Sequence, residues 1–251
     1  MIASDPSLAF LAIAFAVAVL AGGTASNVGF GIGSLLTPLL ATRLPTDLAI
    51  AVVALPHLSA SALRGWRLRA AVDRSVLVRF GVLSAAGGLI GALAFVQLAP
   101  EPLTRILGLL LLLTATAGIA GWSERWSPRG VLVWVLGALS GFFGGVAGNQ
   151  GGLRAAALSA FGLAPVTFVA TSTIIGVLVD LVRTPIYVYR HGPALADEWS
   201  SVAVCLAGVL AGTLLGERIL LGMSRERFRV IVSLAIGLLG AWFLLGPGPR
   251  P

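Results

Sequence analysis

Apolar residues fill this chain in long runs, and glycine-rich stretches interrupt the runs at two places. Most runs approach the roughly 20 residues that a helix needs to cross a lipid bilayer. The runs at 109–113 and 231–245 do not alternate between apolar and polar positions, as the strands of a membrane β-barrel do. The pattern therefore predicts an all-α, polytopic membrane protein.

We expect about eight full spans and two short helical pieces. The full spans are predicted at 8–22, 47–63, 76–98, 103–122, 131–145, 166–188, 200–220 and 228–245. The pieces at 33–41 and 152–161 are too short to cross alone, so each is re-entrant or completes the span before it. Irregular backbone at this depth requires burial in protein or a water-filled cavity.

The two glycine-rich stretches begin 119 residues apart, at Gly22 and Gly141, and this offset also places Gly29 on Gly148 and Gly33 on Gly152. Matching interruptions in two halves are typical of transporters built from repeats, whose substrate site lies where the broken helices meet. We therefore predict two membrane repeats, 1–125 and 126–251. The same offset pairs further residues: Ala41 with Ala160, Leu44 with Leu163, Ala51 with Ala170 and Arg64 with Arg183.

The arginines predict that the two repeats are inverted. The loop at 64–79 holds five Arg and the loop at 218–229 holds four, so the positive-inside rule places both loops in the cytoplasm. Equivalent loops of the two halves then lie on opposite sides, as repeats related by a two-fold axis in the membrane plane require. The C-terminus is expected outside, and the N-terminus with it.

Composition supports a membrane protein and excludes several other classes. Charged residues make up 11% of the chain, against about 25% in a soluble domain. All 17 basic residues are Arg, which we attribute mainly to a GC-rich coding sequence, and the net charge of +7 indicates topology and not a nucleic-acid partner. The single cysteine, Cys205, excludes an intramolecular disulfide.

The sequence contains neither a metal-ligand cluster nor a nucleotide-binding loop, so we predict no enzyme activity and no cofactor. The expected partners are the lipid bilayer and a small anionic substrate. Coupling to H⁺ or Na⁺ and formation of a homo-oligomer stay open.

Several motifs together resemble the sulfite exporter TauE/SafE family. They are the paired glycine stretches, Pro38 within 33–40, the run at 170–173 and the start of the fourth span at 105–108. The resemblance covers about residues 8 to 246 and implies a bacterial inner-membrane permease for small anions such as sulfite or organosulfonates. The chain departs from the family pattern in its alternating first glycines, in Ala157 where a proline is usual, and in Arg154.

Arg154 is the leading candidate for contact with the anion. A charge inside a membrane costs about 3 kcal/mol, so few are kept without a reason. Arg154 follows Gly152 by two residues, where a helix N-terminus would add a partial positive charge and the guanidinium could bind two oxygens. Alternatively, its side chain snorkels to an interface or pairs with a carbonyl.

Neutral hydrogen-bond donors near both interruptions are further substrate-binding candidates. Amides could donate to an anion or cap the broken helices, and hydroxyls could face the substrate or bond the carbonyl four residues back. The candidates are Asn27, Asn149, Gln150, Gly31, Gly33, Gly151, Gly152, Thr171 and Ser172.

His57 and Asp180 lie within predicted spans and are candidates for coupling, because either could take up a proton as the anion moves. The alternatives are a packing role for His57 and a local ion pair of Asp180 with Arg183, three residues along one helix. Arg64 and Arg183 end equivalent helices and are either interface anchors or residues that attract anions to the entrances.

We thus predict a secondary transporter that works by alternating access between the two repeats, and its family resemblance implies an exporter. A passive anion channel and a membrane partner or sensor that transports nothing are the alternative functions.

Overall fold

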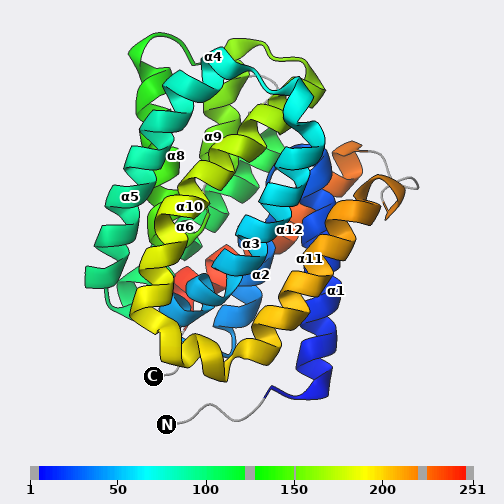
Figure 1. Cartoon of the computed structure of the whole chain (residues 1–251). Helices are drawn as coiled ribbons and strands as arrows, with labels where there is room; N and C mark the ends of the chain where they lie inside the picture. Colours follow the sequence, from blue (N-terminus) through cyan, green and yellow to red (C-terminus); the bar gives the residue numbers. More distant parts are fainter. Residues whose placement is uncertain (1–5, 122–127, 150, 220–224, 247–251) are drawn as a thin grey trace.

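The computed structural model describes residues 6–121, 128–149, 151–219 and 225–246, and this part of the chain is helical without a strand (Figure 1). The first half contains α1 (Leu8–Val28), α2 (Ile32–Ala41), α3 (Thr46–Leu68), α4 (Arg74–Val76), α5 (Val82–Gln97) and α6 (Pro100–Ala120). The second contains α8 (Val131–Ala147), α9 (Gly151–Leu158), α10 (Pro165–Asp197), α11 (Trp199–Ile219) and α12 (Arg225–Leu245).

The predicted all-α, polytopic class is confirmed. Among the described residues, six helical segments are long and apolar enough to cross a membrane, namely α1, α3, α4 with α5, α6, α10 and α11. The apolar helix α8 is shorter, as is the apolar part of α12. The eight expected spans each coincide with one of these segments, and the two short pieces coincide with α2 and α9. The repeat boundary expected at 125/126 lies outside the described residues.

The glycine-rich stretches are mostly helical, which corrects the prediction that they break the helices from Gly22 and Gly141. Helix α1 runs to Val28 and α8 runs to Ala147. Gly29 and Gly148 end them in the left-handed conformation, with φ of 86° and 68°, that glycine adopts without strain. Each donates its N–H to the carbonyl four residues back.

The helical glycines bring pairs of helices into close contact. A Cβ atom added at Gly22 of α1 would lie 2.3 Å from the carbonyl oxygen of Val209 in α11. One added at Gly141 of α8 would lie 1.9 Å from the carbonyl oxygen of Ser84 in α5. Glycine is therefore required at both positions, since any side chain would push the backbones apart.

The reciprocal contacts also match between the halves. A Cβ atom added at Gly212 would lie 2.0 Å from the carbonyl oxygen of Val19, and one added at Gly87 would lie 2.2 Å from that of Ala138. Val19 and Ala138 are again 119 residues apart. Figure 1 shows α1 with α11 on one side of the bundle and α5 with α8 on the other.

Helices α3 and α10 cross the middle of the bundle and run antiparallel to one another (Figure 1). Asp47 lies near His191, and Arg64, 17 residues further along α3, bonds Thr173. Helices α6 and α12 are antiparallel as well, because Gly108 packs against Gly240 whereas Gly118 packs against Ser233. Both pairs join helices at matched places in the two halves.

Candidate functional site

The two breaks lie against each other. A Cβ atom added at Gly33 would be 2.2 Å from the carbonyl oxygen of Gly148, and one added at Gly151 would be 2.2 Å from the Cβ atom of Phe30. Across the same contact, the Ser34 hydroxyl donates to the Asn149 side-chain oxygen at 3.0 Å. The first turns of α2 and α9 therefore meet inside the protein.

Arg154 lies beside this junction. Its side chain is buried, with the residue only 2% exposed, and its Nε donates to the hydroxyl of Ser172 at 3.0 Å. Ser172 is next to Gly29, where an added Cβ atom would be 3.6 Å from the hydroxyl oxygen. Within the described chain, Nη1 of Arg154 has no hydrogen-bond partner. The guanidinium is thus held inside the protein and does not snorkel to its surface.

Arg64 has closely similar surroundings. It is 5% exposed, its Nε donates to the hydroxyl of Thr173 at 2.8 Å, and its Nη1 has no partner among the residues described. Thr173 directly follows Ser172 on α10. Arg64 from α3 and Arg154 from α9 therefore reach the same turn of α10.

His57, Asp180 and Arg183 form one buried unit. Nδ1 of His57 lies 2.6 Å from one carboxylate oxygen of Asp180, and Nε of Arg183 donates to the other at 2.8 Å. Nη1 of Arg183 also donates to the carbonyl of Gly144, in the last turn of α8. The expected ion pair between Asp180 and Arg183 is present, and the structure adds His57 to it.

Arg64 and Arg183, expected as interface anchors or as residues at the entrances, are both buried. Arg183 is 1% exposed and lies 14 residues before the end of α10, which is longer than the predicted span of 166–188. Arg64 lies in α3 and not in the connection that follows this helix. Arg64 bonds Thr173 of α10, and Arg183 bonds Asp180 and the carbonyl of Gly144 in α8, so both side chains lie inside the protein.

Two other candidates have hydrogen bonds within the fold. Asn27 lies in the last turn of α1, not in the break, and its Nδ2 donates to the carbonyls of Gly23 and Gly216. The Thr171 hydroxyl accepts from the backbone N–H of Asp73 in the α3–α4 connection. The hydrogen bonds of Asn27 fit the alternative in which its amide satisfies backbone carbonyls of the helices. The hydrogen bond of Thr171 fits a structural role. Gln150 lies outside the described residues.

The structure brings Asn149 and Thr37 to the junction. Nδ2 of Asn149 and Oγ1 of Thr37 are buried without a hydrogen-bond partner in the described part of the chain. A Cβ atom added at Gly148 would lie 3.9 Å from the Thr37 oxygen. Sequence reasoning missed Ser34 and Thr37, although their spacing of three residues, directly after the first break, places both hydroxyls on one face of a helix.

Comparison with known protein families assigns this chain. The model of the family described as sulfite exporter TauE/SafE matches residues 14–243. The chain belongs to the sulfite exporter TauE/SafE family. No curated protein and no solved structure matches it. Membership makes the chain a multi-pass protein of a family of membrane transporters for sulfur anions, so the chemistry required of its site is binding.

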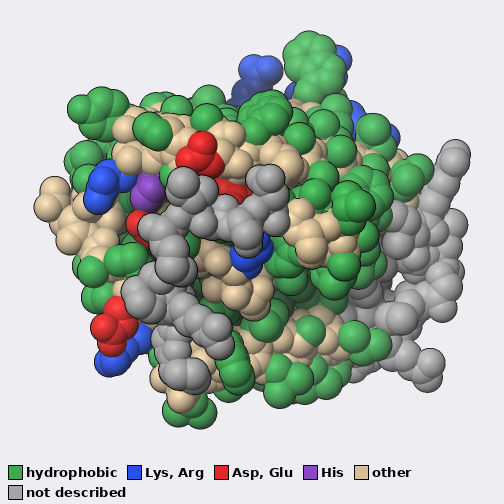
Figure 2. Space-filling view, turned by 90° about the horizontal axis from the view of Figure 1, so that it is seen from below, with side chains coloured by type: hydrophobic (Ala, Val, Ile, Leu, Met, Phe, Trp, Pro, Cys, Tyr) green, Lys and Arg blue, Asp and Glu red, His purple; other side chains and the backbone are tan. Residues whose placement is uncertain are grey.

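Because a membrane transporter of this family connects two aqueous sides, both ends of the bundle are relevant. At one end, where α10 meets α11, Arg43 bonds both carboxylate oxygens of Glu198 at 3.0 and 2.9 Å. The Ser201 hydroxyl donates to the same carboxylate. Figure 2 views this end and shows few charged side chains among many apolar ones. This ion pair ties the α2–α3 connection to the start of α11.

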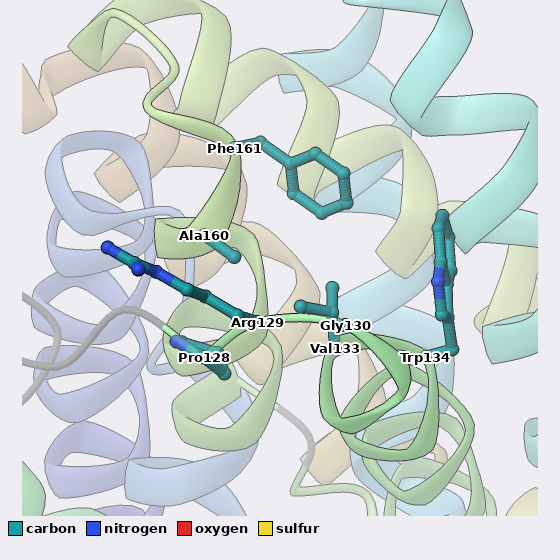
Figure 3. A pocket seen from close by; sticks show the side chains of 7 residues that line it. All are labelled: Pro128, Arg129, Gly130, Val133, Trp134, Ala160 and Phe161. Atoms are coloured by element: carbon teal, nitrogen blue, oxygen red, sulfur yellow. The ribbon is translucent and has the colours of Figure 1, made fainter.

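At the other end, a shallow hollow of about 300 Å³ opens between the start of α8 and the turn after α9 (Figure 3). No buried arginine lines it, so it is separate from the junction of the two breaks. The lining residues are Pro128, Arg129, Gly130, Val133, Trp134, Ala160 and Phe161. The part of the chain described here holds no group of three or more His, Cys, Asp or Glu that could bind a metal.

Proposed function

We propose that this chain is a secondary transporter that exports a small sulfur-containing oxyanion, sulfite or an organosulfonate, across a bacterial inner membrane. The anion would bind at the junction of the two breaks, with Arg154 as its main contact. The observation that carries this proposal is the buried guanidinium of Arg154, whose Nε is fixed by Ser172 and whose Nη1 has no partner in the described chain. An unsatisfied buried donor is costly, and a bound oxyanion would remove that cost.

The surrounding groups suit an anion. Helices α2 and α9 both begin at the junction, where unpaired backbone N–H groups and the helix dipole favour negative charge. The glycines at 31, 33, 151 and 152 keep side chains away from that backbone. Asn149 and Thr37 would add neutral donors without burying another charge.

The matched contacts of the two halves support an inverted repeat and alternating access. Helices at matched places lie side by side and antiparallel, as α3 with α10 and α6 with α12 do, which is the arrangement that a two-fold axis perpendicular to the helices would produce. In a membrane that axis lies in the bilayer plane. Such symmetry offers two equivalent states, open to opposite sides. We propose that the connections at 64–79 and 218–229 face the cytoplasm and that the C-terminus lies outside.

The unit of His57, Asp180 and Arg183 is the proposed coupling element. Histidine changes its charge near neutral pH, and a proton gained or lost by His57 would alter the balance around Asp180. Arg183 connects that carboxylate to the end of α8 through Gly144, next to the second break. A change of charge at His57 would therefore be felt at the junction.

The test is uptake of radiolabelled sulfite into proteoliposomes under imposed proton and sodium gradients. We expect gradient-dependent uptake by the wild type and loss of at least about 90% of it in Arg154→Ala, because a charge-assisted contact is worth more than one factor of ten. Arg105→Ala is the matched control, since Arg105 is exposed and pairs with Glu101 on the surface. Uptake by Arg154→Ala at the wild-type rate would remove Arg154 from the site.

The same assay separates the alternatives. A passive channel would carry current at high rates without dependence on either gradient. A membrane partner that transports nothing would show neither uptake nor binding.

A further inference from the structure

The central charges do not balance. Asp180 pairs with Arg183, whereas the hydrogen-bond partners of Arg64 and Arg154 in the described residues are hydroxyl groups on α10. Their partners, Thr173 and Ser172, are consecutive residues of α10, so the two guanidinium groups reach the same turn of that helix. The charge of Asp180 acts on both of them, but this carboxylate already pairs with Arg183, so the three buried guanidinium groups share its single negative charge. Arg64 and Arg154 each have an Nη1 without a partner in the described residues.

The imbalance follows from one difference between the halves. Arg64 and Arg183 are matched at the offset of 119 residues, and the residue matched to Asp180 is Ser61. Ser61 is buried on α3, one helical turn before Arg64, but it carries no charge. The arginine of the second half thus has a carboxylate partner on its own helix. The arginine of the first half has no carboxylate at the matched position.

We infer that Arg64 and Arg154 together select an oxyanion with two negative charges over one with a single charge. This inference rests on the proposed function and specifies its substrate. An anion of charge −2 neutralises both guanidinium groups and accepts a charge-assisted hydrogen bond from each, whereas a monoanion leaves one buried charge uncompensated. Fully deprotonated sulfite, thiosulfate and a sulfonate that also carries a carboxylate meet this requirement.

The geometry assigns different roles to the two arginines. Arg154 lies at the junction of the breaks, beside Ser172 and Gly29, so it contacts any anion bound there. Arg64 approaches from α3 through Thr173, and its contribution is the second charge. Arg64 therefore determines the preference for charge, while Arg154 is needed for binding as such.

The experiment measures binding of sulfoacetate and sulfoacetamide to the detergent-purified protein by titration calorimetry. These ligands share the sulfonate and differ mainly in the second negative charge. We expect the wild type to bind sulfoacetate at least about tenfold more tightly. Arg64→Gln should lose most of that preference while its affinity for sulfoacetamide changes little. Arg154→Gln should bind both ligands more weakly.

Two further variants keep the inference falsifiable if Arg64→Gln fails to fold. Arg64→Lys retains the charge and should retain the preference for the dianion. Ser61→Asp places the missing carboxylate beside Arg64 and should remove the preference. Two results would overturn the inference and leave the proposed function standing. One is equal affinity of the wild type for both ligands, and the other is an equal loss of affinity for both ligands in Arg64→Gln. Binding of neither ligand would count against the proposed function itself.

Discussion

The two matched arginines occupy equivalent places and have different surroundings. Arg183 bonds Asp180 and the carbonyl of Gly144, so its charge is neutralised within its own half. Arg64 bonds only the hydroxyl of Thr173, and its Nη1 has no partner in the described chain. An internal repeat therefore conserves the position of a side chain more strictly than its role, because one changed neighbour alters the local charge.

The two breaks differ in the same way. The amide of Asn27, before the first break, ties α1 to α11 through Gly216. The amide nitrogen of Asn149, within the second break, has no hydrogen-bond partner in the described part of the chain. The amide of Asn27 thus holds two helices together, while Asn149, with Arg154 and with Thr37 of α2, is among the proposed contacts of the anion.

The largest expected effect follows from removing the charge that neutralises Arg183. Asp180→Ala should lower the free energy of unfolding by about 3 to 5 kcal/mol, because it leaves a buried guanidinium without its partner. Thermal unfolding in detergent measures the loss. Ser61→Ala is the matched control in the other half and should change the stability by less than about 1 kcal/mol. Equal losses in both variants would contradict the contrast between the two arginines.

Next in size is the steric requirement at the matched helix pairs. Gly141→Ala and Gly22→Ala should each lower the melting temperature, at a cost of about 1 to 3 kcal/mol, since the new Cβ atom would overlap a carbonyl oxygen. Gly192→Ala is the control, because no atom lies within 4 Å of a Cβ atom there. It should stabilise α10 by up to about 1 kcal/mol. Loss of stability in only one of the two contact variants would show that the halves pack differently.

A smaller effect is expected at the end where α10 meets α11. Glu198→Gln should destabilise the protein by about 1 to 2 kcal/mol, because its carboxylate is nearly buried and accepts bonds from Arg43 and Ser201. Glu101→Gln, at an exposed pair with Arg105, should cost less than about 1 kcal/mol. Denaturation at low and high salt measures both, and equal costs would mean that the buried pair has no special role.

The smallest expected effect concerns the polar residues beside the breaks, Thr37 and Asn27. Thr37→Val should weaken anion binding by about threefold without loss of stability, because the hydroxyl has no partner in the described fold. Asn27→Ala should do the reverse, lowering stability by about 1 kcal/mol while leaving anion affinity unchanged. Calorimetry and thermal unfolding of both variants measure the two quantities. A loss of affinity in Asn27→Ala would return Asn27 to the site.

Much of the architecture can be read from local patterns. The long apolar runs predict the helices, and the matching glycines predict two related halves, because both depend on residues close in sequence. The sequence predicts breaks that begin several residues too early. The reason is that a glycine that packs against a neighbouring helix cannot be distinguished in sequence from one that ends its own helix. Only the positive φ angles at Gly29 and Gly148 separate these cases.

The amino-acid sequence alone was sufficient for the helical membrane class, the family and the ion pair of Asp180 with Arg183, whose members lie three residues apart on one helix. The partners of His57 and Arg64 lie 123 and 109 residues away, and even Ser172 lies 18 residues from Arg154. Helix packing brings these residues together, so only the tertiary structure decided which buried charges are neutralised and which remain available to an anion. The physical reason is that burial and pairing depend on neighbours in space.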